Sequence, residues 1–504
     1  MKITYLGHAG LWIETQDVKI LCDPWLHRNP AFFKSWSVYP NNNHINWDKI
    51  IKETDIIFVS HIHRDHFDEK FLTELYNKNK KIKVLLPDFR FCVLKEDFKK
   101  IGFNNFIIGE EKIGNTTIVT YPSETIDRER EDSCICINDG NLTLLNFNDS
   151  LVTPETKNDI IKRYKKIDWA AGQFSGANWW PTCYHYDDEK KLDLILEYKV
   201  RKIKHYKKMI KYLGVDKMIP IAGPPCFLQK DMLYLNYSEN NKSIFFDNWD
   251  VPEFNELKEV YRTIPGDSFT FDSIKDITTR PFDKEKFILD NQYTVDYKIS
   301  KEKLKTIDSN ILNLFSNLLQ NNSWLGKYIL YKVFINIKGY KCFSLNFRKQ
   351  KVEVLEEPIR KGAYYVINFP QKIIYDLLQN NITDWELAFL SCRCTFEREP
   401  DLYNPWILSF FRNLNNDRLQ KIYQLTKSKE VTEGKITVGD YEVNRYCPHQ
   451  QYDLLYHSKI DLENKTIQCL GHGWMWDLES CEGINCSAKI ICKKIIRKEK
   501  HKVE

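Results

Sequence analysis

Short apolar runs alternate with longer helical stretches through the first part of the chain. Each run is bounded by polar or charged residues, and the runs cover residues 3–14, 18–26, 55–61, 82–87, 141–149 and 216–223. Short runs of this kind are typical of strands, and their alternation with helical stretches is typical of α/β folds. Several runs end in loops that carry His or Asp, so we expect an α/β sandwich with a site at the strand ends.

The pattern changes twice further along the chain. From about residue 240 it is richer in Asn, Lys and aromatic residues, with strand-like runs at 327–337 and 340–347 and helical stretches after them. From about residue 431 it becomes rich in strands and turns. A chain of 504 residues is long enough for roughly three domains. We therefore predict an α/β domain over residues 1–240, an α+β middle region over 241–430 and a small all-β domain over 431–504.

Composition and charge narrow the classes of function. Apolar residues make up 42% of the chain, which is enough for buried cores, but no run of eighteen apolar residues occurs and no membrane span is expected. A net charge of +5 is too small to indicate a nucleic-acid partner. The N-terminus lacks the regions of a signal peptide, and the fourteen cysteines follow no disulfide-framework spacing. We therefore expect a cytoplasmic protein with free thiols.

Two segments are locally basic. Residues 199–211 have helical spacing with Ile203 and Ile210 on one side, which predicts a solvated helix face; contact with a phosphate-bearing substrate is the alternative. Residues 493–502 are expected to form a frayed, solvated end, with docking of an acidic reductase as the alternative.

Two Cys–His pairs near the C-terminus carry the most specific chemistry. Cys447 and His449 are followed, after nineteen residues, by Cys469 and His472. A Rieske 2Fe–2S cluster needs two thiolates on one iron and two neutral imidazoles on the other. A zinc site is the alternative, although structural zinc sites usually use paired cysteines. The Gly and Trp that follow His472 resemble the second cluster loop of Rieske proteins, and this resemblance favours the 2Fe–2S cluster.

The cluster loops lack the cysteines that bridge them in Rieske proteins of the respiratory cytochrome complexes. Tyr452 stands at the first of these positions, and Leu470 and Gly471 stand in the second loop. The resemblance is therefore to the oxygenase and ferredoxin type, at the low end of the Rieske potential range. Three further cysteines match no ligand pattern and are expected to be free thiols, namely Cys481, Cys486 and Cys492.

The electron acceptor is expected upstream of the cluster, because only thirty-two residues follow His472. Directly after the apolar run at 55–59, three histidines and an aspartate lie within six residues. These residues are His61, His63, Asp65 and His66. Packing explains such a cluster poorly, whereas imidazoles and carboxylates are common metal ligands.

This HxHxDH pattern resembles that of the metallo-β-lactamase superfamily. The resemblance implies an αββα sandwich with one or two metals at the strand ends, where Asp149 matches the bridging aspartate. His8 and Asp23 lie where the superfamily often keeps site residues or residues behind the ligands. A capped loop histidine is the alternative for His8.

Two ligands of the hydrolases in this superfamily lack a match. Where they have a middle histidine, the chain offers only Ser123, Glu124 and Asp127, and Ala222 stands where they have a late histidine. Two histidines and a carboxylate with open positions are instead the arrangement of non-haem iron oxygenases. These departures point from hydrolysis toward oxygen chemistry.

One family combines these features, CMP-N-acetylneuraminate hydroxylase, a monooxygenase that acts on a nucleotide sugar. Three segments of the chain resemble it, at residues 170–191, 219–225 and 385–404. The resemblance covers roughly residues 1–235 and 384–411. That family carries its Rieske domain at the N-terminus, whereas here the Rieske-like motif lies at the C-terminus.

The resemblance implies a Rieske-dependent monooxygenase of a nucleotide sugar or a related amino sugar. One or two non-haem irons would be held by His61, His63, Asp65, His66 and Asp149, with Asp65 and His66 as catalytic residues. The expected partners are dioxygen and an electron donor such as a ferredoxin, a cytochrome b5-like protein or a flavin reductase.

Two other functions remain open from the sequence. One is a metallo-β-lactamase-fold hydrolase whose Rieske domain senses redox state, and the other is an electron carrier with a degenerate upstream domain. The loop at 172–185, with Trp179 and Trp180, is a candidate substrate wall, and an aromatic corner of the core is the alternative.

Overall fold

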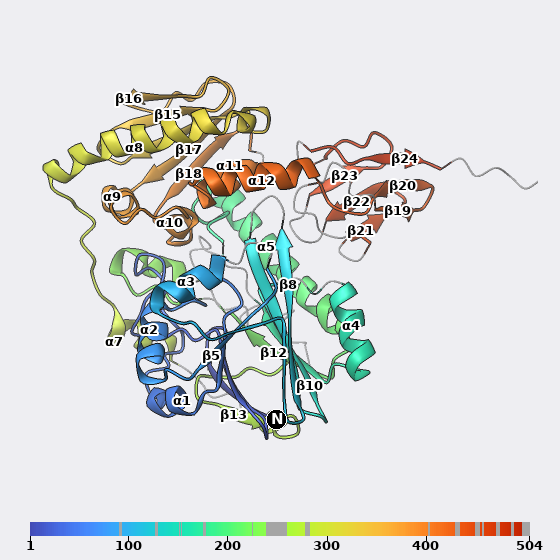
Figure 1. Ribbon diagram of the computed structural model, residues 1–504. Coiled ribbons are helices and arrows are strands. Elements are labelled where there is room, and N and C mark those ends of the chain that lie inside the picture. The colour runs from blue at the N-terminus through green and yellow to red at the C-terminus, as the bar shows by residue number, and fades with distance from the viewer. Residues whose placement is uncertain are drawn as a thin grey trace, which may run out of the picture.

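The computed structural model has three lobes, which follow one another along the chain from blue and green through orange to red in Figure 1. The residues that it describes are 1–89, 93–125, 130–150, 152, 154–174, 178–223, 225–237, 260–277, 283–401, 404–428, 434–448, 454–455, 458–469, 474–484 and 488–495. Within them, no helix is both long and apolar enough to cross a membrane.

Two stacked β-sheets form the N-terminal domain. In the first, the strand order is β13-β1-β2-β3-β4-β5-β6, and β3 to β6 are parallel. Its strands are β1 (Lys2–Gly7), β2 (Gly10–Glu14), β3 (Lys19–Cys22), β4 (Ile56–Phe58), β5 (Lys83–Leu86), β6 (Phe106–Ile108) and β13 (Ser268–Thr270). In the second, the order is β12-β11-β10-β9-β8-β7, and β12 to β10 are parallel. Its strands are β7 (Glu110–Ile113), β8 (Thr116–Thr125), β9 (Arg130–Asn138), β10 (Thr143–Asn148), β11 (Trp169–Gln173) and β12 (Lys217–Ile221).

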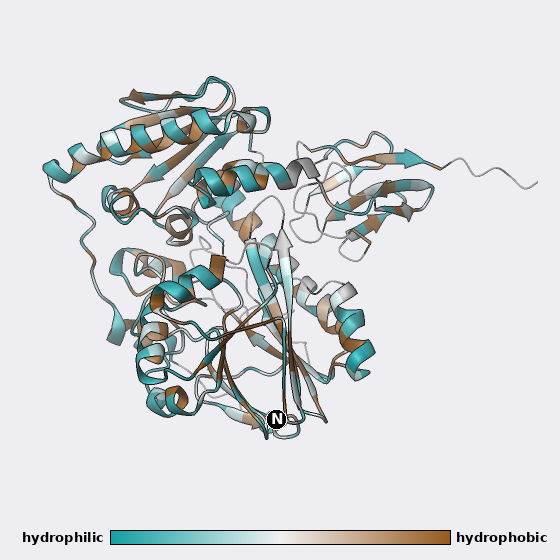
Figure 2. Ribbon diagram, viewed as in Figure 1, coloured by the Kyte–Doolittle hydropathy of each residue, from teal (hydrophilic) through white to brown (hydrophobic). Residues whose placement is uncertain are grey.

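Helices cover the outer face of each sheet. Those over the first sheet are α1 (Trp47–Glu53), α2 (Glu69–Lys78) and α3 (Val93–Ile101), and those over the second are α4 (Pro154–Tyr164) and α5 (Asp188–Leu213). Successive residues of a strand face opposite sides, so Ile57 of β4 packs with the helices and Phe58 packs between the sheets. Several of the strands between the helical layers are accordingly brown in Figure 2. The layer order helix–sheet–sheet–helix is the expected αββα sandwich.

A five-stranded sheet with helices forms the middle domain. Its strand order is β16-β15-β14-β17-β18. The strands are β14 (Lys332–Ile337), β15 (Cys342–Asn346), β16 (Lys351–Leu355), β17 (Tyr364–Phe369) and β18 (Thr395–Glu399). The helices are α8 (Lys301–Asn321), α9 (Gln371–Gln379), α10 (Glu386–Leu390), α11 (Pro405–Arg412) and α12 (Asn416–Ser428). Between β13 and α8 the chain forms α7 (Lys284–Asn291). Short 3₁₀ helices lie at η1 (Lys230–Asn236), at η3 (Ser273–Asp276) and, after α8 in the middle domain, at η4 (Ser323–Lys327).

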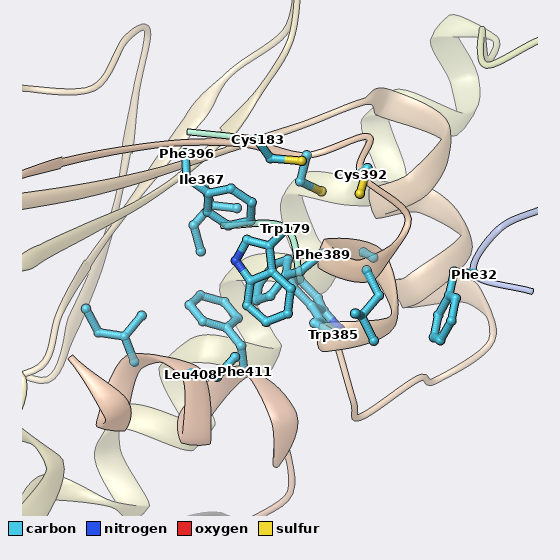
Figure 3. Packing of buried hydrophobic residues seen from close by; sticks show 14 of the residues in the cluster. Phe32, Trp179, Cys183, Ile367, Trp385, Phe389, Cys392, Phe396, Leu408 and Phe411 are labelled. Carbon is cyan, nitrogen blue, oxygen red and sulfur yellow. The ribbon is translucent and has the colours of Figure 1, made fainter. Parts of the chain in front are cut away.

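One hydrophobic core runs through both the N-terminal and the middle domain. It includes Leu145 of the second sheet and also Trp385 and Phe411 of the middle domain. At the junction, the ring of Trp179 lies 5.4 Å from that of Phe389 (Figure 3). Because Trp179 is only 8% exposed, it forms a core corner and not an open substrate wall.

Two small antiparallel sheets form the C-terminal domain. Their orders are β19-β20-β24 and β21-β22-β23. The strands are β19 (Lys435–Val438), β20 (Tyr441–Asn444), β21 (Ser458–Asp461), β22 (Thr466–Cys469), β23 (Met475–Asp477) and β24 (Cys492–Lys494). The domain has its own hydrophobic core, which includes Val443, Ile467 and Trp476.

Cys481 and Cys492 form a disulfide, so the prediction of free thiols is wrong for this pair. The chain turns after β23 and returns in β24, which brings the two Cα atoms within 5.7 Å. This separation suits a disulfide, and it depends on a turn that cysteine spacing does not reveal. Cys486 lies outside the described residues.

The prediction of a solvated face over residues 199–211 holds for Lys204 and Lys211, which are exposed, but it is wrong for Lys199, which is 2% exposed. Lys199 lies four and seven residues before Ile203 and Tyr206, and both of these are buried. Positions four and seven apart share a helix face, so Lys199 belongs to the buried stripe of α5. At the other basic segment, Lys493 and Lys494 are exposed in β24, and the rest of that tail beyond residue 495 lies outside the described residues.

The division of the chain at residues 240 and 430 remains a prediction. Strand β13, at residues 268–270, lies beyond residue 240 and pairs with β1 at the edge of the first sheet. The chain therefore returns to the N-terminal domain before it enters the middle domain.

Candidate metal centre

Strand ends from both sheets bring the candidate ligands together. His8 follows β1, Asp23 follows β3 and His61 lies just beyond β4 in the first sheet. In the second sheet, Asp149 follows β10 and Ala222 follows β12. Loops at the carboxyl ends of strands are where α/β folds usually place their sites. The structure therefore places these residues at the strand ends, where the sequence predicts the site.

Four residues at these strand ends have left-handed backbone torsions. Their φ angles are 50° for His8, 41° for Asp23, 46° for Asn148 and 48° for Ala222. Such torsions are unfavourable for residues with a side chain and persist where other contacts fix them. Here the N–H of Ala222 donates to the His8 carbonyl at 2.9 Å, and the Asn148 side chain donates to Asp23 at 2.7 Å. The backbone is therefore held in a strained form around the site.

Asp23 orients His66. One oxygen of its buried carboxylate accepts hydrogen bonds from the backbone and side chain of Ser60 and lies 3.3 Å from His66 Nδ1. The opposite nitrogen, Nε2, lies 3.8 Å from Asp65 Oδ2 and 3.9 Å from Asp149 Oδ1. A carboxylate on one ring nitrogen of a histidine commonly aims the other nitrogen at a metal. His66 is therefore set to bind through Nε2.

His61 and His63 face each other. Nε2 of His61 lies 3.0 Å from Nδ1 of His63. On its far side, Nδ1 of His61 lies 2.9 Å from the Ser60 hydroxyl and 3.6 Å from Asp132 Oδ1. The far nitrogen of His63, Nε2, lies 3.5 Å from Oε2 of Glu386 in the middle domain. In both rings, the nitrogen that faces away from the other histidine therefore lies close to a polar partner.

Two overlapping sets of side chains could hold an ion. His8, Asp65 and His66 form one set, and His61, His66 and Asp149 form the other, with ligand atoms within 4.8 Å of one another in each. His8 Nε2 lies 2.9 Å from Asp65 Oδ2. This position favours a site role for His8 over that of a capped loop histidine.

The electrostatics of the site favour a cation. Burial alone would lower the pKa of His66, but Asp65, Asp23 and Asp149 raise it to about 10. Burial alone would raise the pKa of Asp65, but His66 and His8 hold it well below its usual range. These opposed charges are nearly or fully buried, so each depends on the others for stabilisation.

The donor atoms fit a metal ion. Asp65 Oδ1 and His66 Nε2 are buried and have no hydrogen-bond partner among the described residues. Two nitrogens that share an ion at about 2.1 Å lie about 3.0–3.4 Å apart, and the inward nitrogens of His61 and His63 are 3.0 Å apart. Imidazole and carboxylate donors suit zinc, manganese and non-haem iron.

Sequence analysis did not identify three buried acidic residues, of which Asp132 and Glu386 lie beside the site. Glu131 and Asp132 are buried in β9, and Ser123 of β8 pairs with Asp132 in the strand register. The side chain of Glu124 and all of Asp127 lie outside the described residues. The sequence carries a signal for Glu131 and Asp132, because they come just before the apolar run at 134–137. Carboxylates are rarely fully buried in a strand unless they have a partner. The third is Glu386, which is 4% exposed.

The two expected cluster cysteines are fully buried in the core of the C-terminal domain. Cys447 follows β20, and Cys469 is the last residue of β22. The backbone N–H of Cys469 donates to the carbonyl of Trp474 at 2.8 Å. His449 and His472 lie outside the described residues, so their place as ligands remains a prediction.

Replacement of Asp23 with alanine tests the orientation of His66. We expect Asp23→Ala to weaken metal binding roughly 10- to 100-fold, as loss of a residue behind a ligand does elsewhere. Asp17→Ala is the matched control, because Asp17 accepts hydrogen bonds from Asn115 and Thr116 in the same domain away from the site. Competition with a chelating dye under anaerobic conditions measures the affinity. An unchanged affinity in folded Asp23→Ala protein would contradict the role.

Three family models match the chain. The beta-lactamase superfamily domain matches residues 2–143, the Rv3818-like, SCP2-like domain matches residues 307–427, and the Rieske [2Fe-2S] domain matches residues 421–492. The chain carries a metallo-β-lactamase-like domain and a C-terminal Rieske domain. The match to the SCP2-like model lies between the other two along the chain.

Known proteins are similar to this chain over different shares of its length. A predicted Rieske 2Fe–2S iron–sulfur protein of Mycolicibacterium smegmatis is 28% identical, over 95% of this chain and 97% of its own length. The cytidine monophosphate-N-acetylneuraminic acid hydroxylase of Pan troglodytes is 22% identical, over 82% of this chain and 72% of its own length. The crystal structure of a possible metal-dependent hydrolase from Veillonella parvula covers 54% of this chain and 99% of its own, at 14% identity and a TM-score of 0.39.

Proposed function

We propose that this chain is a Rieske-dependent non-haem iron monooxygenase that hydroxylates a nucleotide sugar or a related amino sugar. The observation that carries the proposal is that one chain combines a Rieske domain with an imidazole–carboxylate site that lacks the late histidine of the hydrolases. Rieske clusters transfer electrons, and hydrolysis needs none. Similarity to the sialic acid hydroxylase over 82% of the chain supports the substrate class.

The metallo-β-lactamase-like domain would hold one or two irons. His61, His63 and Asp149 would hold one ion, and His8, Asp65 and His66 would hold a second beside it. Cys447, His449, Cys469 and His472 would hold the 2Fe–2S cluster. When bound, the iron would supply dioxygen chemistry, and the cluster would supply electrons from a ferredoxin, a cytochrome b5-like protein or a flavin reductase.

Residues around the ligands shape the site. Asp23 and Ser60 hold the rings of His66 and His61, so that their Nε2 atoms face inward. The carboxylate of Asp65 pairs with His8 and can hold a proton between its Oδ2 and His8 Nε2. Trp25 packs edge-on against His8 at 5.0 Å, and this indole shields one side of the pair from water.

Metal analysis of anaerobically purified protein tests the proposal. We expect three or four irons in each chain, two of which belong to the cluster. Electron paramagnetic resonance should show a reduced Rieske signal in addition to the signature of the upstream iron. Stoichiometric zinc in the upstream site, with no iron there, would overturn the proposal.

The substrate class is tested by oxygen uptake on CMP-sialic acids and related nucleotide sugars, with an electron donor present. Uptake coupled to formation of a hydroxylated product is the expected result. Turnover of a phosphodiester or ester without oxygen would instead favour a hydrolase whose Rieske domain senses redox state.

A further inference from the structure

A buried ion pair of the middle domain, between Glu386 and Arg412, lies beside the candidate metal centre. Glu386 is the first residue of α10, on the side of the middle domain that faces the N-terminal domain (Figure 1). Arg412, the last residue of α11, pairs through Nε and Nη2 with the two carboxylate oxygens of Glu386. The two residues are 4% and 9% exposed. A forked pair of this kind fixes the carboxylate in one orientation.

The fixed carboxylate faces His63. Oε2 of Glu386 lies 3.5 Å from Nε2 of His63, and the other nitrogen of that ring faces His61. The guanidinium of Arg412 is always charged and pairs with both oxygens of Glu386, which favours the ionised carboxylate. Glu386 is thus an ionised acceptor placed behind a candidate ligand.

The three histidines of the HxHxDH motif are supported from different domains. Asp23 lies behind His66, and Ser60 with Asp132 lies behind His61, all within the N-terminal domain. The group behind His63 comes from the middle domain. Metal-ligating histidines almost always donate their second N–H to such a partner, which fixes ring orientation and tautomer.

The shared core holds α10 in this position. Trp385, directly before Glu386, is fully buried in the core that spans both domains. The backbone of Phe396 also bonds to the N-terminal domain, because its N–H donates to Cys183 and its carbonyl accepts from His185. The position of Glu386 relative to His63 is therefore determined by packing as well as by charge.

We infer that Glu386 of the middle domain is a positioning residue of the metal centre, which accepts a hydrogen bond from His63 Nε2 and presents Nδ1 of that ring to the ion. The inference rests on the proposed metal site. It gives the middle domain a direct part in that site, because the polar partner of His63 Nε2 comes from the middle domain and not from the described residues of the N-terminal domain.

Paired substitutions test the inference without leaving a buried charge alone. Removal of one partner of a buried ion pair is strongly destabilising, whereas replacement of both by apolar residues is often tolerated. Glu386→Leu with Arg412→Met removes the acceptor of His63. Glu386→Gln with Arg412→Met keeps an acceptor at the same position. Glu397→Leu with Arg360→Met is the matched control, because that forked pair lies in the same domain and does not contact His63.

Affinity for Co²⁺ or Fe²⁺ at the upstream site is the readout, measured by chelator competition on the full chain under anaerobic conditions. We expect the Glu386→Leu pair to bind roughly 10- to 100-fold more weakly than the wild type. The Glu386→Gln pair should recover most of this loss, and the control pair should change affinity less than about threefold. Co²⁺ absorption bands should shift only in the first pair.

Wild-type affinity in a folded Glu386→Leu pair would overturn the inference, and so would an equal loss in the control pair. If the Glu386→Leu pair does not fold, Glu386→Met with Arg412→Met replaces it, because this pair also removes the acceptor of His63. The same loss of affinity relative to the Glu386→Gln pair is then expected, and equal affinity of the two pairs would overturn the inference. Failure of the proposed function is distinguishable, since it would appear as wild-type protein that binds metal and does not oxidise substrate.

Discussion

The His61→Ala variant is expected to lose its upstream metal and all substrate oxidation, while its Rieske cluster is still reduced by the donor. His61 presents Nε2 to the site and belongs to the set that includes His66 and Asp149. Loss of a residue behind a ligand weakens metal binding about 10- to 100-fold, so loss of a ligand itself should exceed about 100-fold. Iron content and the paramagnetic signals of the two centres measure the two halves of this prediction separately.

His44→Ala is the matched control for this variant. His44 is an exposed histidine of the same domain, and its ring contacts the carbonyl of Pro265 away from the candidate ligands. Its removal should leave both iron centres and turnover intact. Retention of upstream iron in His61→Ala would contradict the ligand set, and loss of the Rieske signal would contradict the separation of the two centres.

The second large effect is on stability. Trp385→Ala should destabilise the N-terminal and middle domains together by about 3–5 kcal/mol, the usual cost of truncating a buried aromatic residue. The indole is fully buried, lies 5.2 Å from Phe315 and 5.5 Å from Phe369, and donates a hydrogen bond to Ile382. Because the core continues into the N-terminal domain, one unfolding transition should shift as a unit.

Urea unfolding followed by circular dichroism and by cluster absorbance measures this effect. Trp476→Ala is the control, because Trp476 is an equally buried indole in the separate core of the Rieske domain. We expect Trp476→Ala to lose its cluster absorbance at a lower urea concentration than the wild type, while the main unfolding transition is unchanged. If Trp385→Ala splits the main transition in two, the N-terminal and middle domains do not unfold as one unit.

The sequence predicts the parts of the site that follow strand ends. His61, His63, Asp65 and His66 lie within six residues, so one loop brings them together, and Asp149 could be matched because it follows a clear apolar strand. The αββα layers were predictable for the same reason, since short buried strands keep a readable apolar pattern.

Contacts between distant segments were not predictable in this way. Glu386 is 323 residues from His63, and no local periodicity links an acidic residue at a helix start with a loop in another domain. Lys199 was assigned to solvent because of its charge, although helix geometry places it on the buried stripe. The Cys481–Cys492 disulfide depends on a turn whose course spacing does not specify. In each case, tertiary structure overrides the local preference of the residue.

The continuous core also decides where the gene can be cut for recombinant work. A fragment that ends near residue 240 would leave Trp179 and its neighbours against water, because their packing partners Phe389 and Phe396 come from the middle domain. Such a fragment should aggregate, since large exposed apolar surface favours association. A cut between α12 and β19 instead separates two hydrophobic cores. Electron-transfer studies of the Rieske domain and metal-binding studies of the other two should therefore use fragments divided there.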